Sequence, residues 1–241
     1  MTLLSVVKDV CAVVGVAQPA AVVTAIAVNR TMQEMFTLAN EMAQRIAYDN
    51  RDWTVLRKTT TMTGNGIATS FPMPADYKRM LLTANVWGPS SQLAPMSFVP
   101  DTDEWLNRRA RNTTSFSYGE WTMLGGQLLM HPVMSTGATA YYAYLDKNCV
   151  NLTGGGVSDA FVADTDTFRL DERLLKLGMI WQWKANKGTS YAEDMGTFSD
   201  ALAMAMGHDS PAPIIAGRTP MSANAKVAIP SQTIYFPGAT P

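Results

Sequence analysis

The sequence predicts an α+β protein in which helices from both ends of the chain form a bundle, with a mostly antiparallel β subdomain inserted between them in the sequence. Apolar residues recur at helical spacing near both ends. Strand-like stretches separated by glycine-containing turns fill the middle. Residues 209–241 hold six prolines and little charge, which indicates an extended C-terminal arm. The expected divisions are a bundle of residues 1–52 and 168–208, a β subdomain of residues 53–150, a linker of residues 151–167 and an arm of residues 209–241.

The composition describes a chain that can bury a core but has a weakly charged surface. Of 241 residues, 47% are hydrophobic and only 16% are charged, against about 25% in an average soluble domain. We therefore expect partner chains to cover much of the surface, and sixteen methionines suit such adaptable contacts. The net charge of −1 argues against an open nucleic-acid-binding face, because phosphate affinity needs clustered Lys and Arg.

The first expected helix begins near Leu3, with Thr2 or Ser5 as its N-cap, and ends at Gly15. The stretch from Val10 to Val28 lacks charge, but Gly15 and Pro19 interrupt it, so we expect neither a membrane span nor a secretory signal. The two cysteines, Cys11 and Cys149, are far apart, which indicates buried thiols in a reducing cytoplasm rather than a disulfide or zinc framework.

A second, longer helix runs from Val23 or Asn29 to Asn50, with an apolar stripe that begins at Met32. Trp53 follows it and is expected in the core. The β subdomain then combines strands with one short helix near residues 101–112, begun by Asp101. The expected strands are Thr54–Met62, Ile67–Phe71, Leu81–Trp87, Leu93–Val99, Ser117–Leu124, Gln127–His131 and Ala138–Leu145.

Two tight turns are expected in this subdomain. Asn65-Gly66 suits a type I′ hairpin between the first two strands, and Gly125-Gly126 suits another between Ser117–Leu124 and Gln127–His131. Three consecutive glycines, residues 154–156, indicate a flexible link; no P-loop Lys-Ser/Thr follows them. Asp171 begins a helix to Lys187, and Thr189 or Ser190 caps a last helix from Tyr191 to Gly207.

The C-terminal arm carries too many apolar side chains for a solvated tail, so it should lie on its own domain or on a neighbouring chain. The candidate contact residues of the arm are Ile214, Ile215, Val227, Ile229, Ile234, Tyr235 and Phe236.

The search for catalytic chemistry finds no metal-binding motif, cofactor motif or nucleophile motif, and the only histidines are His131 and His208. Two alternatives stay open. Carboxylates near the short helix could serve glycoside hydrolysis: Asp101, Asp103, Glu104 and Glu120. Aromatic residues of the strands could form a sugar-binding platform: Trp87, Trp121, Tyr141, Tyr142 and Tyr144.

The order of elements and three short patterns resemble the head-tail adaptor (connector, head completion) proteins of tailed bacteriophages. The patterns are DWxxL at Asp52–Leu56, LPxDYxR at residues 73–79, and GGxIxLxPxP from Gly125. The resemblance covers about Leu3 to Lys147 and is weaker in the last two helices. Pro72-Met73-Pro74 stands where a Leu-Pro is commoner, and Val133 follows Pro132 where a second proline often occurs.

The resemblance implies a structural virion protein without catalytic residues or cofactors. Such proteins form a ring of identical subunits, usually twelve, that docks on the portal, extends the DNA channel and receives the tail or nozzle. DNA would pass without sequence-specific binding, and no membrane would be involved. The expected location is the head-tail junction of a virion made in a bacterial cytoplasm, and the C-terminal arm is expected to reach the portal. The helices Met1–Val16 and Asp171–Lys187 are expected to pack between subunits.

The stretch Phe71–Trp87 is expected to be the corner where the chain enters the sheet, because Pro72 and Pro74 hold the chain extended. Lys78 and Arg79 would then face solvent or a neighbouring subunit. Together with Arg108 and Arg109 of the short helix, they form the candidate subunit interface.

Overall fold

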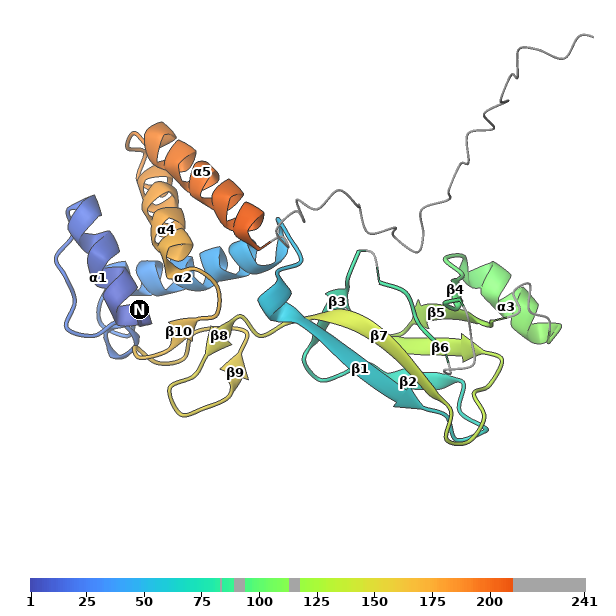
Figure 1. The fold of residues 1–241 in the computed structure, drawn as a ribbon. Coiled ribbons are helices and arrows are strands. Elements are labelled where there is room, and N and C mark those ends of the chain that lie inside the picture. Colours follow the sequence, from blue (N-terminus) through green and yellow to red (C-terminus); the bar gives the residue numbers. More distant parts are fainter. Residues whose placement is uncertain (83, 89–93, 113–117, 210–241) are drawn as a thin grey trace, which may run out of the picture. The chain divides into compact units, whose positions relative to one another are not determined.

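The computed structural model describes residues 1–82, 84–88, 94–112 and 118–209, which belong to one compact unit ending at Asp209. It is a mixed α and β protein (Figure 1). The predicted arm, except Asp209, lies outside the described residues. The α-helices of the described part are α1 (Leu3–Val14), α2 (Arg30–Tyr48), α3 (Thr102–Ala110), α4 (Glu172–Asn186) and α5 (Ala192–His208). Two 3-10 segments, Val23–Ala25 and Thr54–Leu56, precede α2 and the first strand.

The two N-terminal helices have the ends that their sequences predict. The Thr2 hydroxyl accepts from the Ser5 N–H at the start of α1, and Gly15 closes the helix with φ of 73°. Asn29 caps α2, whose buried face begins at Met32 and includes Met35, as the apolar stripe predicted. No helix of the described residues is long and apolar enough to cross a membrane.

Helix α4 is the helix that the other three long helices contact, since α1, α2 and α5 all pack on it (Figure 1). Asp171 caps α4 as predicted, by accepting from the Arg173 N–H. The predicted cap of α5 is wrong: Tyr191 occupies the N-cap without a side-chain bond, and the Thr189 hydroxyl instead donates to the Lys184 carbonyl at the end of α4.

The strands of the described part form three small sheets. The first has the order β1-β7-β3, the second β2-β6-β5-β4, and the third β10-β8-β9. All neighbouring strands are antiparallel except β4 and β5. The strands are β1 (Arg57–Thr63), β2 (Ser70–Pro72), β3 (Tyr77–Met80), β4 (Ser97–Phe98), β5 (Glu120–Leu124), β6 (Gln127–His131), β7 (Thr139–Asp146), β8 (Val150–Asn151), β9 (Val157–Ser158) and β10 (Thr167–Phe168).

The Asn65-Gly66 hairpin prediction is wrong, although a turn is present. Strand β1 pairs with β7 and strand β2 pairs with β6, so the strands on either side of the turn belong to different sheets. Only Gly66 has positive φ, whereas a type I′ turn needs positive φ at both central residues. The Asn65 side chain accepts from the N–H groups of Ile67 and Ala68 and turns the chain toward the second sheet. The Gly125-Gly126 hairpin is confirmed, with φ of 59° and 72° between β5 and β6.

The predicted strand Leu81–Trp87 is also wrong. Strand β3 starts at Tyr77 and ends at Met80, and a turn follows in which the Ala84 N–H donates to the Leu81 carbonyl. Of the described residues of this segment, only Trp87 returns to the sheet, through an isolated bridge to Tyr141. The strand therefore includes the charged residues that had been expected to precede it.

Residues 151–167 do not form a linker. They contain β9 and the start of β10, and Phe161 is buried in the helical core. Asp166 is buried, and its carboxylate accepts from the N–H groups of Thr153, Val162 and Ala163. These bonds lower the pKa of Asp166 although burial alone would raise it, so the glycine-rich loop is held by a buried anion.

Two hydrophobic clusters fill the interior. One lies among the helices and includes Trp53, Cys11 and Cys149, all buried as predicted. The Trp53 indole N–H donates to the Ile46 carbonyl at 2.7 Å, which ties the end of α2 to the start of the β region. The second cluster lies among the strands and includes Trp121 and Tyr142.

Candidate functional site

The predicted corner at residues 71–87 is joined to the end of α2 by an ion pair. The Arg79 guanidinium pairs with the Asp52 carboxylate, which also accepts from the Leu82 N–H at 3.2 Å. Asp52 belongs to the DWxxL pattern and Arg79 to the DYxR pattern. Two of the patterns that carry the resemblance are therefore in direct contact in the structure.

A buried carboxylate, that of Asp146, lies at the C-terminal end of β7. Asp146 is fully buried and contacts the Lys58 Nζ at 2.9 Å and the Arg169 guanidinium at 2.8 Å. It also accepts from the Asn148 N–H at 2.9 Å. Burial by itself would raise the pKa of Asp146, but these bonds outweigh it and lower the pKa. The carboxylate thus joins the sheet to the segment that leads into α4.

Asp76 extends this network and connects the second pattern to β7. It contacts the Lys58 Nζ at 2.5 Å and accepts from the Tyr144 hydroxyl at 2.8 Å. Burial raises the pKa of Tyr144 to about 12, with a further contribution from the bond to Asp76, so Tyr144 stays a proton donor to Asp76. The sequence offered one signal for this network. Asp146 follows Tyr142 and Tyr144 at alternate positions of β7, which face inward.

The four cationic candidates for a subunit interface all make contacts inside the chain. The Lys78 Nζ lies 4.6 Å from the centroid of the Tyr48 ring, and Arg79 is paired with Asp52. Arg108 is paired with both Glu104 and Glu120, and the Arg109 guanidinium donates to the Thr69 hydroxyl at 2.9 Å. The two pairs lie on different elements, β3 and α3. Their role between subunits stays a prediction.

Three of the four carboxylates considered for glycoside hydrolysis have structural partners: Asp101, Glu104 and Glu120. Asp101 caps α3, as predicted, by accepting from the N–H groups of Asp103 and Glu104. Glu104 and the buried Glu120 both pair with the Arg108 guanidinium, which joins α3 to β5. These ion pairs give both glutamates a structural role, the attachment of α3 to β5.

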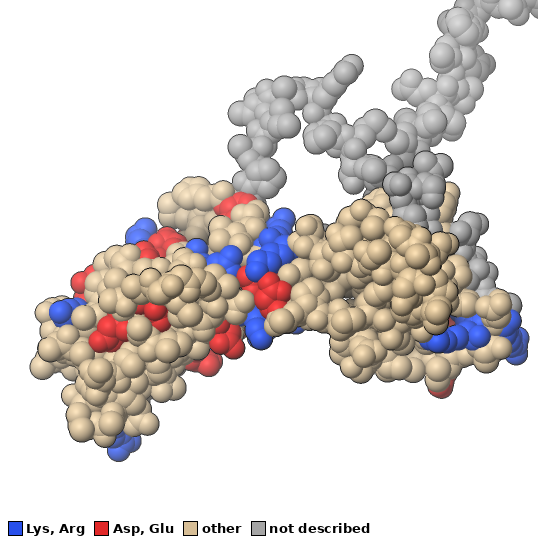
Figure 2. Space-filling model, turned by 90° about the horizontal axis from the view of Figure 1, so that it is seen from below, with Lys and Arg blue, Asp and Glu red and all other residues tan. Residues whose placement is uncertain are grey.

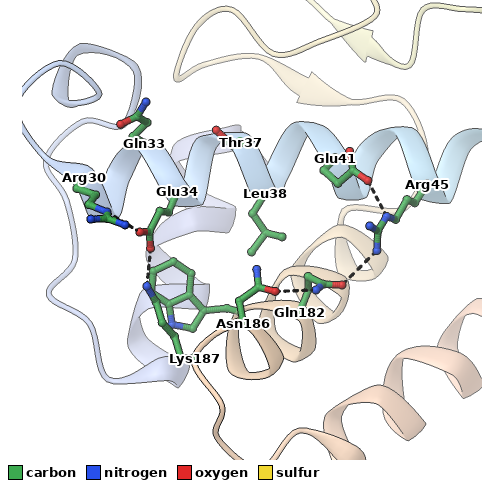
Figure 3. Close-up of a pocket in the computed structure, with 11 residues that line it drawn as sticks. Arg30, Gln33, Glu34, Thr37, Leu38, Glu41, Arg45, Gln182, Asn186 and Lys187 are labelled. Carbon is green, nitrogen blue, oxygen red and sulfur yellow. Dashed lines mark hydrogen bonds and ion pairs between the residues drawn. The ribbon is translucent and has the colours of Figure 1, made fainter.

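An open groove of about 720 Å³ lies between α2 and the end of α4 (Figure 3). Its charged side chains bind one another: Glu34 contacts Arg30 at 3.1 Å and Lys187 at 2.6 Å. On its other side Arg45 contacts Glu41 at 2.8 Å and Gln182 at 3.1 Å. The bond from Lys187 is the largest cause of a lowered Glu34 pKa. The groove is polar, and its positive and negative side chains neutralise one another. Such a surface suits a hydrated contact with another protein better than a small apolar ligand.

Two of the aromatic residues considered for a sugar platform are half exposed. Trp121, Tyr142 and Tyr144 are buried, whereas Trp87 is 48% exposed and Tyr141 45%. The backbones of Trp87 and Tyr141 exchange two N–H to carbonyl bonds of 2.8 Å. Residues paired in this way project their side chains to the same face of a sheet.

The surface over the strands carries little charge. Figure 2 shows Lys, Arg, Asp and Glu over the helices and at the boundary with the strands, and a blue patch at the far right end, while the middle of the strand part in that view is free of them. On β1 and β7 the outward residues include Thr59, Thr61 and Tyr141. Helix α5 is also poorly covered, since Met204 is 62% exposed and Met195 45%.

Within the described ranges, no three His, Cys, Asp or Glu side chains come together as a metal site. His131 lies at the end of β6 with its ring against Trp105, and His208 ends α5. The apolar candidates of the C-terminal arm, from Ile214 to Phe236, lie outside the described residues. In comparisons with known proteins, neither a family model nor a curated protein matches this chain.

Proposed function

We propose that this chain is a structural protein of a tailed-bacteriophage particle, an adaptor between head and tail with no catalytic activity of its own. In this proposal identical copies form a closed ring, of about twelve, in which two different patches of each copy meet. The ring docks on the portal, extends the DNA channel without sequence-specific binding and receives the tail or nozzle. It is made in the bacterial cytoplasm and ends at the head-tail junction.

The observation that supports this best is the contact between the patterns of the resemblance. Asp52 pairs with Arg79, and Asp76 with Lys58 and Tyr144. These contacts connect the segment after α2 to β3, and the turn before β3 to β1 and β7. Residues with this purely architectural use are what a scaffold protein needs.

The finer architecture belongs to the same proposal. The four long helices act as a bundle that carries subunit contacts, with the exposed methionines of α5 on its open side. Methionine-rich surfaces adapt to neighbouring chains. The arm of residues 210–241 provides the contact to the portal or to a neighbour, through its apolar residues from Ile214 to Phe236.

The test is assembly with a portal from the same source. The protein is mixed with the portal and imaged, beside a chain truncated after Asp209. We expect rings on the portal with the full chain and their loss with the truncated chain. The absence of rings with the full chain contradicts the adaptor function, and rings from both chains contradict only the role of the arm.

A carbohydrate-binding module is the second candidate, because Trp87 and Tyr141 are paired through their backbones and both side chains are about half exposed. Exposed aromatic faces on one side of a sheet can pack on sugar rings. On a glycan array, binding that disappears in Trp87→Ala and persists in Leu82→Ala, an exposed control, would favour the module. Absence of binding by the native chain excludes it for the glycans tested.

A further inference from the structure

Strand β1 lies at an edge of its sheet in the described part of the chain, in the order β1-β7-β3. The direction of its backbone groups follows from the register. Tyr141 of β7 exchanges both of its backbone bonds with Trp87, on the side away from β1. Its neighbour Tyr142, paired with Thr60, therefore bonds toward β1, because successive residues of a strand alternate in this respect.

This alternation makes Thr59, Thr61 and Thr63 the residues whose N–H and carbonyl groups face outward from β1. The turn after the strand agrees, since Gly64, four residues after Thr60, donates to the Ala138 carbonyl at 2.7 Å. The side chains of the same three threonines are exposed. Strand β1 thus offers a row of backbone donors and acceptors beside a face of small, uncharged side chains.

Natural sheets protect such edges with charges, prolines or bulges. The register of β1 with β7 runs without a bulge from Arg57 to Thr63, and residues 59–63 contain neither charge nor proline. The one lysine, Lys58, is held inward by Asp76 and Asp146. An edge without these protections is suited to pair with another strand.

The chain itself contains a segment that matches this edge. The compact unit Met1–Asp209 forms this sheet from its own residues, and no described strand pairs with the outer side of β1. Beyond Asp209, the β-branched and aromatic run Thr233-Ile234-Tyr235-Phe236 lies between Pro230 and Pro237, the pattern of a strand. Residues 227–241 carry no charged side chain. The 22 residue steps from 209 to 231 span up to about 70 Å, enough to reach another molecule.

We propose that residues 231–236 of one copy add a strand to the open edge of β1 in a second copy, in the antiparallel direction. The other strand pairs of this sheet, β1 with β7 and β3 with β7, are antiparallel as well. The inference deepens the proposed function, because it rests on a ring to bring copies together and names the contact that the arm makes.

The first test is disulfide trapping between chains. A Thr61→Cys chain is mixed with chains that carry Thr233→Cys, Ile234→Cys or Tyr235→Cys, and covalent dimers are measured under mild oxidation. Native Cys11 and Cys149 are buried and contribute little. Side chains of a strand alternate between faces, so we expect dimers either at 233 and 235 or at 234 alone. Equal yields at all three positions, or no dimers, overturn the proposal.

Each of the three pairs is also placed on one chain. A disulfide that forms only within that chain overturns the assignment to a second copy.

The second test places proline at positions of β1 whose N–H points either outward or toward β7. The chain also carries Thr59→Cys and is mixed with the cysteine chains of the first test. Thr61→Pro removes an outward N–H, so we expect the native melting temperature and about tenfold fewer dimers. Thr60→Pro is the matched control, because it removes an N–H that faces β7 and should lower the melting temperature. Dimer formation unchanged by Thr61→Pro refutes strand addition.

Imaging of the same samples separates the two proposals. Rings that persist in Thr61→Pro and in a chain lacking residues 230–241 leave the adaptor function intact and refute strand addition. Alternating disulfides in particles that are not rings support strand addition and refute the ring.

Discussion

Replacement of Asp146 by asparagine tests whether the buried network holds the sheet to the helical part. The carboxylate is fully buried and contacts Lys58 at 2.9 Å and Arg169 at 2.8 Å. Removing one partner of a buried ion pair costs about 3–5 kcal/mol, because the remaining charge is left uncompensated. Here Lys58 keeps Asp76 at 2.5 Å and Arg169 keeps the Val55 carbonyl at 3.1 Å. We therefore expect the lower end, about 3 kcal/mol.

The measurement is thermal and urea unfolding of the full chain, followed by near-UV circular dichroism. For a unit of this size, about 3 kcal/mol corresponds to a melting temperature lower by about 6–12 °C. Asp9→Asn is the matched control, since Asp9 forms a partly exposed pair with Lys176 at 3.4 Å. Such a pair contributes less than about 1 kcal/mol. If Asp146→Asn is as stable as Asp9→Asn, the network does not have the role that we assign to it.

Three further predictions concern acid, packing and thiols. The pKa of Asp146 is lowered in the folded chain, so its contribution to stability is present above the unfolded pKa and is lost as pH falls through the folded pKa. In unfolding experiments from pH 6 downward, the loss of stability should begin near the unfolded pKa of about 4 and should be smaller in Asp146→Asn than in the native chain. Equal dependence of stability on pH in the two chains would contradict this. A Cβ at Gly64 would lie 2.6 Å from the Met134 Cβ, whereas one at Gly154 meets nothing within 4 Å; Gly64→Ala should lower the melting temperature by several degrees and Gly154→Ala should not, and equal shifts would refute the packing. Burial raises the pKa of Cys149 to about 11, so a thiol reagent at pH 8 should modify it only as urea unfolds the chain; rapid labelling without urea would contradict the buried assignment.

The helices were predictable because their signals are local. The stripe from Met32 along α2, the Thr2 cap and the Gly15 end each depend on residues within a few positions. The same holds for the Gly125-Gly126 hairpin, where both glycines supply the positive φ that the turn needs. In these segments the structure confirms the prediction.

The pairing of the strands was not predictable in the same way. Asn65-Gly66 is followed by a strand that pairs with β6, because the partner of a strand is chosen by packing far along the sequence. In place of the strand expected at Leu81–Trp87, the structure has β3, which starts at Tyr77. There Tyr77 pairs with Asp146 of β7, and Arg79 forms an ion pair with Asp52. Polar residues read as a corner were in fact paired within the sheet.

The candidate site shows the same division. The sequence singled out Lys78, Arg79, Arg108 and Arg109, and their partners inside the chain appear only in the fold. The groove between α2 and α4 joins Arg45 to Gln182, 137 residues apart, and no spacing rule connects them. The glycines at 154–156 predicted a link, but the buried carboxylate of Asp166 holds that segment.

The sequence by itself determined the mixed class of the fold, the helices with the caps of α1, α3 and α4, the one glycine hairpin and the weakly charged composition. These follow from the conformational preferences of neighbouring residues and from composition, which need no partner. Only the tertiary structure decided which strands pair, that Asp146 is buried between two cations and that β1 is the outermost strand of its sheet among the described residues. Each of these depends on groups brought together from distant positions, whose contact energies exist only once the chain has closed around them.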